Sequence, residues 1–168
     1  MEYDFKTQLD LGKRWEEMVY RHLLAKEGIV SIHDLSNQIL RQSRGIDGMV
    51  VHEEDSILHA IYFDVKTDFR ISETNNFFIE TSSSNKTKWC MLTTKAEKFL
   101  YYDAFWWKLY YIPILPLRNR YRKFGIGMKH LQVINSTYKW EWIVIGVEDL
   151  LRILPDIQIE NITPLEKE

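Results

Sequence analysis

Five residues of this chain could together hydrolyse a phosphodiester bond: Glu16, Asp47, Asp64, Lys66 and Glu80. Such hydrolysis requires negative charge on the transition state to be neutralised and a nucleophile to be made from water near neutral pH. A divalent cation does both, and Mg²⁺ prefers hard oxygen ligands, which carboxylates supply. We therefore expect Asp47, Asp64 and Glu80 to bind Mg²⁺, with Glu16 assisting directly or through water.

The spacing of Asp64 and Lys66 assigns a role to the lysine. Side chains two residues apart in a strand share a face, so Lys66 would lie beside Asp64 while Val65 points into the core and keeps its backbone carbonyl available as a metal ligand. Lys66 could orient or help to deprotonate the attacking water and then stabilise the developing charge. The tripeptide alone is weak evidence, because Asp4-Phe5-Lys6 repeats it.

The first element that must position these residues is an amphipathic helix over residues 9–26, followed by Gly28 as a stop. Glu17 and Arg21 would form an outward i, i+4 pair. Glu16 instead shares the inward face with apolar residues, where an acid needs a cation. The alternative for Glu16 is a surface position paired with Lys13.

The other acids fall at the ends of apolar, β-branched runs that predict strands. We expect the apolar run 60–63 at the centre of the strand 57–67 to be covered on both faces, and a capping box at Thr94 to begin a short helix. The element order predicts an α/β fold with a central mixed β-sheet flanked by helices. We expect one domain over residues 1–168, with a core at about 9–112 and 140–154 and a basic accessory segment at 113–139. The predicted strands cover residues 28–32, 46–52, 57–67, 77–80, 101–102, 108–112 and 140–145, and a last helix covers 147–154.

These motifs resemble the PD-(D/E)xK nuclease superfamily over about residues 12–103. Gly12-Lys13-Arg14-Trp15-Glu16 is similar to the G-x-x-x-E start of the first helix of resolvase-like members, Gly45-Ile46-Asp47-Gly48 takes the place of P-D, and Asp64-Val65-Lys66 fits D/E-x-K. The segments 76–80, 93–97 and 101–102 look like phage and viral members.

The resemblance implies a restriction-endonuclease-like core, dependence on Mg²⁺ or Mn²⁺, cleavage of DNA and a metal-associated role for Glu16. The sequence departs from the family pattern at Ile46, where proline often stands. Residues 113–141 match no family element, and we expect substrate choice to reside there.

Charge is unevenly distributed, although the net charge is -2. Residues 104–140 and 81–96 contain no acid, so these segments could follow a phosphate backbone. The alternative is a solvated helix face or ordinary counter-ions. The candidate DNA-binding residues are Arg44, Lys86, Lys88, Lys95, Arg118, Arg120, Arg122 and Lys123.

Composition limits the compartment and the role of the aromatic residues. A single cysteine excludes an intrachain disulfide, and the polar residues 1–10 do not resemble a secretion signal, so we expect a cytoplasmic protein. The apolar stretch 99–117 should form two strands rather than a membrane helix, because charges and prolines interrupt it. Trp106, Trp107, Tyr110 and Tyr111 are expected in the core or at a dimer interface rather than as base-stacking platforms.

The leading hypothesis is a magnesium-dependent deoxyribonuclease acting on single-stranded, double-stranded or branched DNA. A Holliday-junction resolvase would be a homodimer that makes paired cuts. A non-catalytic nucleic-acid-binding protein on the same scaffold, or an interaction module whose acids lie on the surface, are the alternatives from other classes. The nuclease hypothesis fails if the carboxyl groups of Asp47 and Asp64 are too far apart to share a cation.

Overall fold

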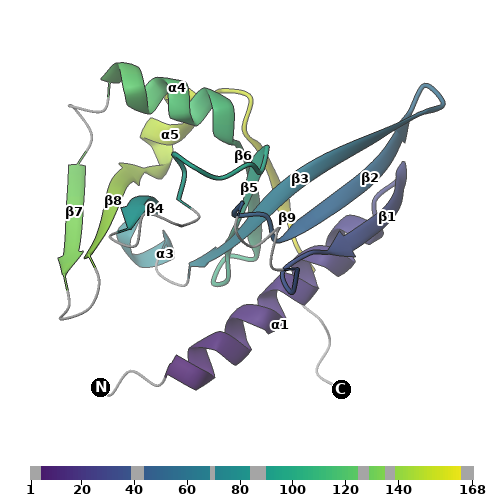
Figure 1. The fold of residues 1–168 in the computed structure, drawn as a ribbon, viewed down its shortest axis with the longest axis horizontal. Coiled ribbons are helices and arrows are strands. Elements are labelled where there is room, and N and C mark those ends of the chain that lie inside the picture. Colours follow the sequence, from purple (N-terminus) through teal and green to yellow (C-terminus); the bar gives the residue numbers. More distant parts are fainter. Residues whose placement is uncertain are drawn as a thin grey trace.

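A computed structural model describes residues 5–38, 44–68, 71–83, 90–124, 129–134 and 139–163. Lys86 and Lys88 lie outside these residues. Figure 1 shows the arrangement of the helices and strands along the chain. In chain order they are α1 (Phe5–Leu24), β1 (Ile29–Asp34), β2 (Gly48–Glu54), β3 (Ile57–Asp68), α3 (Ile71–Thr74), β4 (Asn76–Ser83), β5 (Lys98–Asp103), β6 (Lys108–Pro113), α4 (Ile114–Phe124), β7 (Lys129–Ile134), β8 (Lys139–Gly146), α5 (Val147–Ile153) and β9 (Gln158–Asn161).

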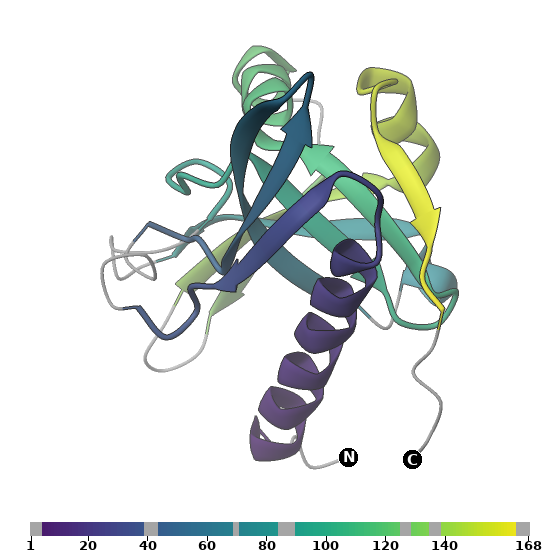
Figure 2. The same ribbon diagram turned by 90° about the vertical axis from the view of Figure 1, so that its right-hand side faces the viewer.

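The larger of two sheets has six strands in the order β1-β2-β3-β5-β6-β9. Its β3–β5 pair is parallel and the other pairs are antiparallel, so the sheet is mixed as predicted. The helix α1 packs against one face of this sheet, and Figure 2 shows it crossing the strands there. The predicted α/β fold with a mixed sheet flanked by helices is confirmed.

The second sheet contains three antiparallel strands in the order β4-β8-β7. It was not predicted as a separate sheet, and it carries Glu80 in β4. Its residues Phe77 and Ile143 are fully buried with Phe99 and Tyr101 of β5 in the larger hydrophobic core. The face of the six-stranded sheet opposite α1 is therefore covered by this sheet together with α4 and α5.

The strand β3 is buried unevenly along its length. Residues 57–60 are exposed, whereas Phe63, Asp64 and Val65 are buried. The prediction that the run 60–63 is covered on both faces was therefore wrong for Ala60, because the first part of the strand extends with β2 as a projecting hairpin (Figure 1). Only the last part of the strand lies between the two cores.

The helix predicted at Thr94 is also absent. The hydroxyl of Thr94 donates to the carbonyl of Gly45 at 2.6 Å and accepts from the amide of Ala96, so this side chain links two loops rather than capping a helix. Residues 99–117 form β5, β6 and the start of α4, as the interrupting charges and prolines suggested. Among the described residues, no helix is both long and apolar enough to span a membrane.

The segment predicted to be a basic accessory region contains a packed helix. Ile114 and Leu117 of α4 are buried in the larger hydrophobic core. Further along the segment, β7 pairs with β8 in the second sheet. The described part of residues 113–139 is thus integrated with the rest of the protein.

Candidate active site

Asp47 is held where β2 separates from β3. Its amide donates to the carbonyl of Phe63 at 3.0 Å, and its carbonyl accepts bonds from the amide of Leu35 at 2.7 Å and the hydroxyl of Tyr20 at 3.2 Å. Its carboxylate Oδ2 accepts the amide of Val65 at 2.9 Å. The carboxylate therefore accepts a backbone hydrogen bond that a carbonyl of a neighbouring strand would normally accept. This bond fixes the carboxylate next to the backbone of Asp64.

Gly48 explains how the two strands approach so closely beside Asp47. It pairs with Phe63 in the β2–β3 register, and a Cβ at Gly48 would lie 2.4 Å from the ring of Phe63. Tyr20 packs edge-on against the same ring, with centroids 5.6 Å apart. The absence of a side chain at position 48 is thus required for the ring packing that supports Asp47.

Asp64 lies in the buried part of β3 and is 1% exposed. Within the described residues, neither carboxylate oxygen has a hydrogen bond of good geometry, while the ammonium of Lys66 lies 2.6 Å from Oδ1. Burial raises the pKa of Asp64 well above its usual range. Lys66 opposes that rise and the adjacent carboxyl of Asp47 adds to it. Asp47 and Asp64 are therefore neighbours, and whether they share a cation stays a prediction.

Lys66 lies on the same face of β3 as Asp64, as strand alternation predicted. Its side chain is 40% exposed. Burial acts to lower the pKa of Lys66, but the carboxylates of Asp64 and Asp47 raise it above its ordinary value. The side chain is thus an ammonium at neutral pH in the protein alone, which favours orientation of water and stabilisation of charge over proton abstraction.

Glu16 approaches the acids from α1. Val65 packs in the core beneath α1. Because side chains alternate along a strand, Asp64 lies on the opposite face of the sheet. Glu16 therefore approaches the acids near Asp47, at the end of the strand. Burial, then Asp47 and then Asp34, raises the pKa of Glu16 to about 7. The predicted inward position is confirmed, since Glu16 is half-buried whereas Glu17 is exposed and paired with Arg21.

Two neighbours of Glu16 were missed by the sequence analysis. Tyr20, one helical turn after Glu16, donates to the backbone of Asp47, and its spacing of four residues could have indicated a shared helix face. Asp34 ends β1 and accepts bonds from the amide and hydroxyl of Ser36. No local pattern in the sequence singles out Asp34, because it reaches this region through the pairing of β1 with β2.

Glu80 approaches Lys66 from the second sheet. Burial raises the pKa of Glu80, and Lys66 opposes that rise. The register of β4 with β8 shifts between Glu80 and Ser82, and the carbonyl of Glu80 accepts the amide of Met91 at 2.9 Å. A cavity of about 170 Å³ opens between the two sheets here, lined by Lys66, Phe78, Ile79, Glu80, Met91, Phe99, Tyr101 and Trp142.

The donor set suits a metal only in part. Among the described residues, no three His, Cys, Asp or Glu side chains are grouped closely enough to hold one ion. Binding of metal by Asp47, Asp64 and Glu80 stays a prediction. The buried carboxylate of Asp64 next to Asp47 does fit a hard cation that takes its other ligands from water and substrate.

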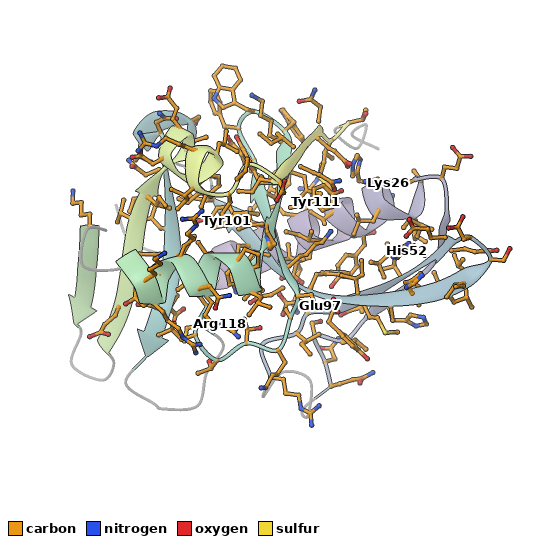
Figure 3. The ribbon with its side chains drawn as sticks, turned by 90° about the horizontal axis from the view of Figure 1, so that it is seen from above. Lys26, His52, Glu97, Tyr101, Tyr111 and Arg118 are labelled. Atoms are coloured by element: carbon orange, nitrogen blue, oxygen red, sulfur yellow. The ribbon has the colours of Figure 1, made fainter. Side chains whose placement is uncertain are left out.

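One loop connects the parts of the site. The amide of Lys95 donates to the carbonyl of Arg44 at 2.8 Å, next to the contact between Thr94 and Gly45. The guanidinium of Arg118, on α4, donates to the carbonyls of Met91 and Thr94 at 2.8 to 3.0 Å (Figure 3). This loop therefore links the turn before Asp47 to α4. Arg118 was predicted to bind DNA, but here its side chain holds this loop in place.

The other candidate DNA-binding residues divide by position. Arg44 and Lys95 are exposed and joined through their backbones beside the turn that leads to Asp47. Arg120, Arg122 and Lys123 are exposed on α4. Arg44 and Lys95 are thus the described basic residues that the backbone links to the acid site.

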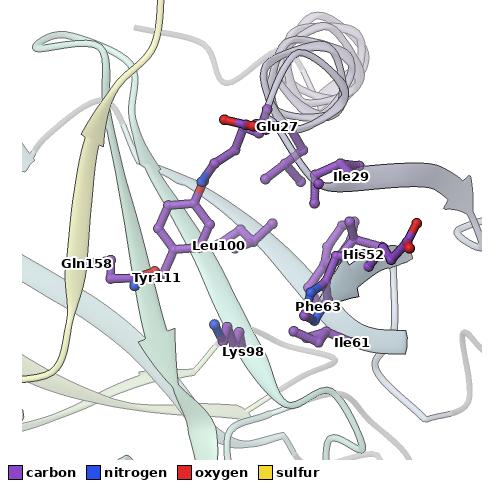
Figure 4. A pocket seen from close by; sticks show the side chains of 14 residues that line it. Glu27, Ile29, His52, Ile61, Phe63, Lys98, Leu100, Tyr111 and Gln158 are labelled. Atoms are coloured by element: carbon purple, nitrogen blue, oxygen red, sulfur yellow. The ribbon is translucent and has the colours of Figure 1, made fainter. Parts of the chain in front are cut away.

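Another cavity lies away from the predicted site residues. It has a volume of about 210 Å³ and lies beyond the C-terminal end of α1, on the α1 face of the larger sheet. Figure 4 shows Lys98, Leu100 and Tyr111 along one side and His52 and Phe63 along the other. None of the predicted catalytic residues lines it, so cavity size does not locate the candidate site in this protein.

Comparison with known proteins adds one finding. No family model matches the chain, and no curated protein matches it. Among solved structures, D212, a nuclease from a fusselovirus, is similar with a TM-score of 0.37 and 14% sequence identity, over 92% of this chain and 94% of that chain. At this level of similarity, the functional argument depends on the site itself.

Proposed function

We propose that this protein is a metal-dependent DNA nuclease. The observation that carries the proposal is the carboxylate of Asp64, which is 1% exposed and lies beside the carboxyl of Asp47, with the ammonium of Lys66 2.6 Å from its Oδ1. A buried carboxylate that is not fully paired costs stability, so its retention at this position needs a compensating ligand. A hard divalent cation supplies that compensation and makes the site chemically useful.

Asp47, Asp64 and the backbone carbonyl of Val65 would hold the cation, Mg²⁺ or Mn²⁺. When bound, it would neutralise charge on a phosphate and lower the pKa of a water molecule. Val65 contributes only its carbonyl, because its side chain packs in the core beneath α1. Two carboxylates with several remaining sites for water and phosphate are a usual Mg²⁺ environment.

The other residues act on water and substrate around this pair. Lys66, as an ammonium partly open to solvent, orients the attacking water and stabilises charge that develops on the phosphate. Glu80 approaches Lys66 from the second sheet and acts through water rather than as a third direct ligand. Glu16 likewise acts through water near Asp47, where it limits the positions that water can take.

DNA contacts follow from the basic residues near the site. Arg44 and Lys95 would bind the phosphates that flank the cleaved bond, because they adjoin the turn that positions Asp47. Arg120, Arg122 and Lys123 would extend the contact along α4. Branched DNA cut by a homodimer is a narrower form of the same proposal.

Nuclease assays test the proposal directly. Linear, circular, single-stranded and branched DNA are incubated with the protein in Mg²⁺, in Mn²⁺ and with chelator. We expect metal-dependent cleavage that Asp64→Ala and Lys66→Ala abolish while circular dichroism shows a folded chain. Asp55→Asn, at the exposed turn before the same strand, is the matched control and should cut normally. Binding of DNA without turnover in either metal would favour a non-catalytic binding protein.

A further inference from the structure

The turn between β5 and β6 exposes two adjacent aromatic side chains. Phe105 is 61% exposed and Trp106 is 58% exposed. Their rings pack edge-on, with centroids 5.1 Å apart and planes at 80°. The sequence analysis expected Trp106, Trp107, Tyr110 and Tyr111 in the core or at a dimer interface. Tyr110 and Tyr111 are buried and Trp107 is partly buried, whereas Trp106 lies outside the core, and a dimer interface there stays a prediction.

The backbone of this turn is held firmly from both ends. Asp103 is buried, and its Oδ1 accepts the amides of Phe105 at 3.0 Å and Trp106 at 3.2 Å. Trp107 has a φ of 57°, a left-handed conformation that is rare for a bulky residue. Such outliers persist where the surroundings impose them, and they occur often at functional sites.

Two contacts hold Trp107 in this conformation. Its ring packs edge-on against Trp15 of α1, with centroids 5.8 Å apart. Its carbonyl accepts the amide of Ile162 at 2.7 Å. Together these contacts fix a backbone that directs Phe105 and Trp106 to solvent, which is costly for large apolar side chains unless a partner uses them.

The turn lies at the end of the sheet toward which the acid-bearing strand runs. In the parallel β3–β5 register, Asp64 is opposite Phe99 and Asp68 is opposite Asp103. At about 3.3 Å per residue, Asp103 is therefore about 13 Å beyond the level of Asp64 along the strands. At about 3.4 Å per stacked nucleotide, this is about four nucleotides from the acid pair.

We propose that Phe105 and Trp106 form a stacking platform for unpaired nucleobases, so that the substrate presents single-stranded DNA on this side of the cleaved bond. This inference rests on the proposed nuclease function. Bases fit the turn because every base has a flat face that stacks on an aromatic ring without sequence readout. The adjacent charges are favourable, since Lys108 follows Trp107 and the carboxylate of Asp103 is bound to backbone amides.

Fluorescence anisotropy tests the platform separately from catalysis. Phe105→Ala/Trp106→Ala is made in the Asp64→Asn protein, which should not cut DNA, and binding is measured to a single-stranded oligonucleotide and to its duplex in Mg²⁺. Loss of one base stack corresponds to about a tenfold loss of affinity. We expect at least this loss for the single strand and less than about a twofold change for the duplex.

Controls separate the platform from general apolar effects. Leu115→Ala, which removes a side chain 61% exposed on α4, should leave both affinities unchanged, and Trp106→Phe should retain most single-strand binding. Equal affinity of the double variant and its parent for the single strand would overturn the platform while leaving the nuclease proposal intact if the wild-type protein cuts DNA. A wild-type protein that neither binds nor cuts DNA would overturn both.

Discussion

Two acids of this protein, the partly buried Glu160 and the buried Asp64, have opposite surroundings. The carboxylate of Glu160, in β9, binds the ammonium of Lys26 at 2.5 Å, the ring of His22 at 2.9 Å and the hydroxyl of Tyr111 at 2.7 Å. Figure 3 shows Lys26 and Tyr111 close together. These bonds overcome the effect of burial and lower the pKa of Glu160 to about 2. For Asp64, burial dominates, and it raises the pKa.

The difference shows what each group does for the fold. Glu160 connects the last described strand to α1, and its charge is fully paired by side chains far away in sequence. Asp64 is more deeply buried but has a single close cation, Lys66. The first arrangement stabilises the folded protein, whereas the second reduces stability in favour of a ligand. A protein that needed only stability would not place an acid at position 64.

The largest expected effect comes from removing the charge of Asp64. Asp64→Asn should reduce DNA cleavage by more than about 100-fold, because the cation and the attacking water lose their main anchor. Its melting temperature without metal should stay the same or rise, since a buried charge is removed. A steady-state cleavage assay and differential scanning calorimetry measure the two quantities. An unaltered cleavage rate would show that Asp64 is not part of the catalytic machinery.

A substitution at Gly48 should disturb the backbone that supports Asp47. Gly48→Ala places a Cβ against the ring of Phe63 and should lower the free energy of unfolding by about 1–3 kcal/mol, as overpacking does. Cleavage should fall as well, because Asp47 precedes this residue. Urea denaturation and the cleavage assay measure both effects. Gly12→Ala, where an added Cβ meets nothing within 4 Å, is the control: it should leave cleavage unchanged and, as a glycine replaced inside a helix, should raise the free energy of unfolding by up to about 1 kcal/mol.

The paired acid should behave in the reverse way to Asp64. Glu160→Gln should lower the free energy of unfolding by about 1–2 kcal/mol, because charged hydrogen bonds to three partners are weakened, and it should leave cleavage unchanged. The comparison variant is Asp149→Asn, which breaks an exposed pair with Arg152 and should alter stability by less than about 0.5 kcal/mol. Equal stabilities of the two variants in urea would contradict the structural role of Glu160.

The pH dependence of stability should sharpen the same contrast. The folded-state pKa of Glu160 is below the value of about 4.3 of a free glutamate. Its contribution is therefore present above about pH 5 and is lost as the pH falls toward 2. Since the side chain is 29% exposed, we expect a contribution of about 1–2 kcal/mol after allowance for solvent. The wild-type protein and Glu160→Gln should converge in stability near pH 2, and a constant difference across this range would contradict the assignment.

Local patterns predicted the parts of the structure that depend on neighbouring residues. The period of α1 placed Glu16 inward, and strand alternation placed Lys66 beside Asp64. The same patterns could not reveal that β4 belongs to a separate sheet, because its pairing with β8 joins Glu80 to Trp142 across 62 positions of the chain. The metal role of Glu80 stays a prediction.

Local rules also failed where a side chain had a better distant partner. Thr94 fits a capping box, but its hydroxyl bonds to Gly45 instead and no helix forms. Arg118 was grouped with basic residues that could contact DNA, yet its guanidinium binds loop carbonyls. In both cases, a tertiary hydrogen bond determined the role of a residue whose local sequence indicated another one.

Metal binding to the free protein is the most direct test of the central claim. Isothermal titration calorimetry with Mn²⁺ is performed on the wild-type protein, on Asp64→Asn and on Glu160→Gln. We predict saturable binding to the wild-type protein and to Glu160→Gln, and loss of that binding in Asp64→Asn. Equal binding by the wild-type protein and Asp64→Asn, or none by the wild-type protein, would contradict the assignment of Asp64 as a metal ligand.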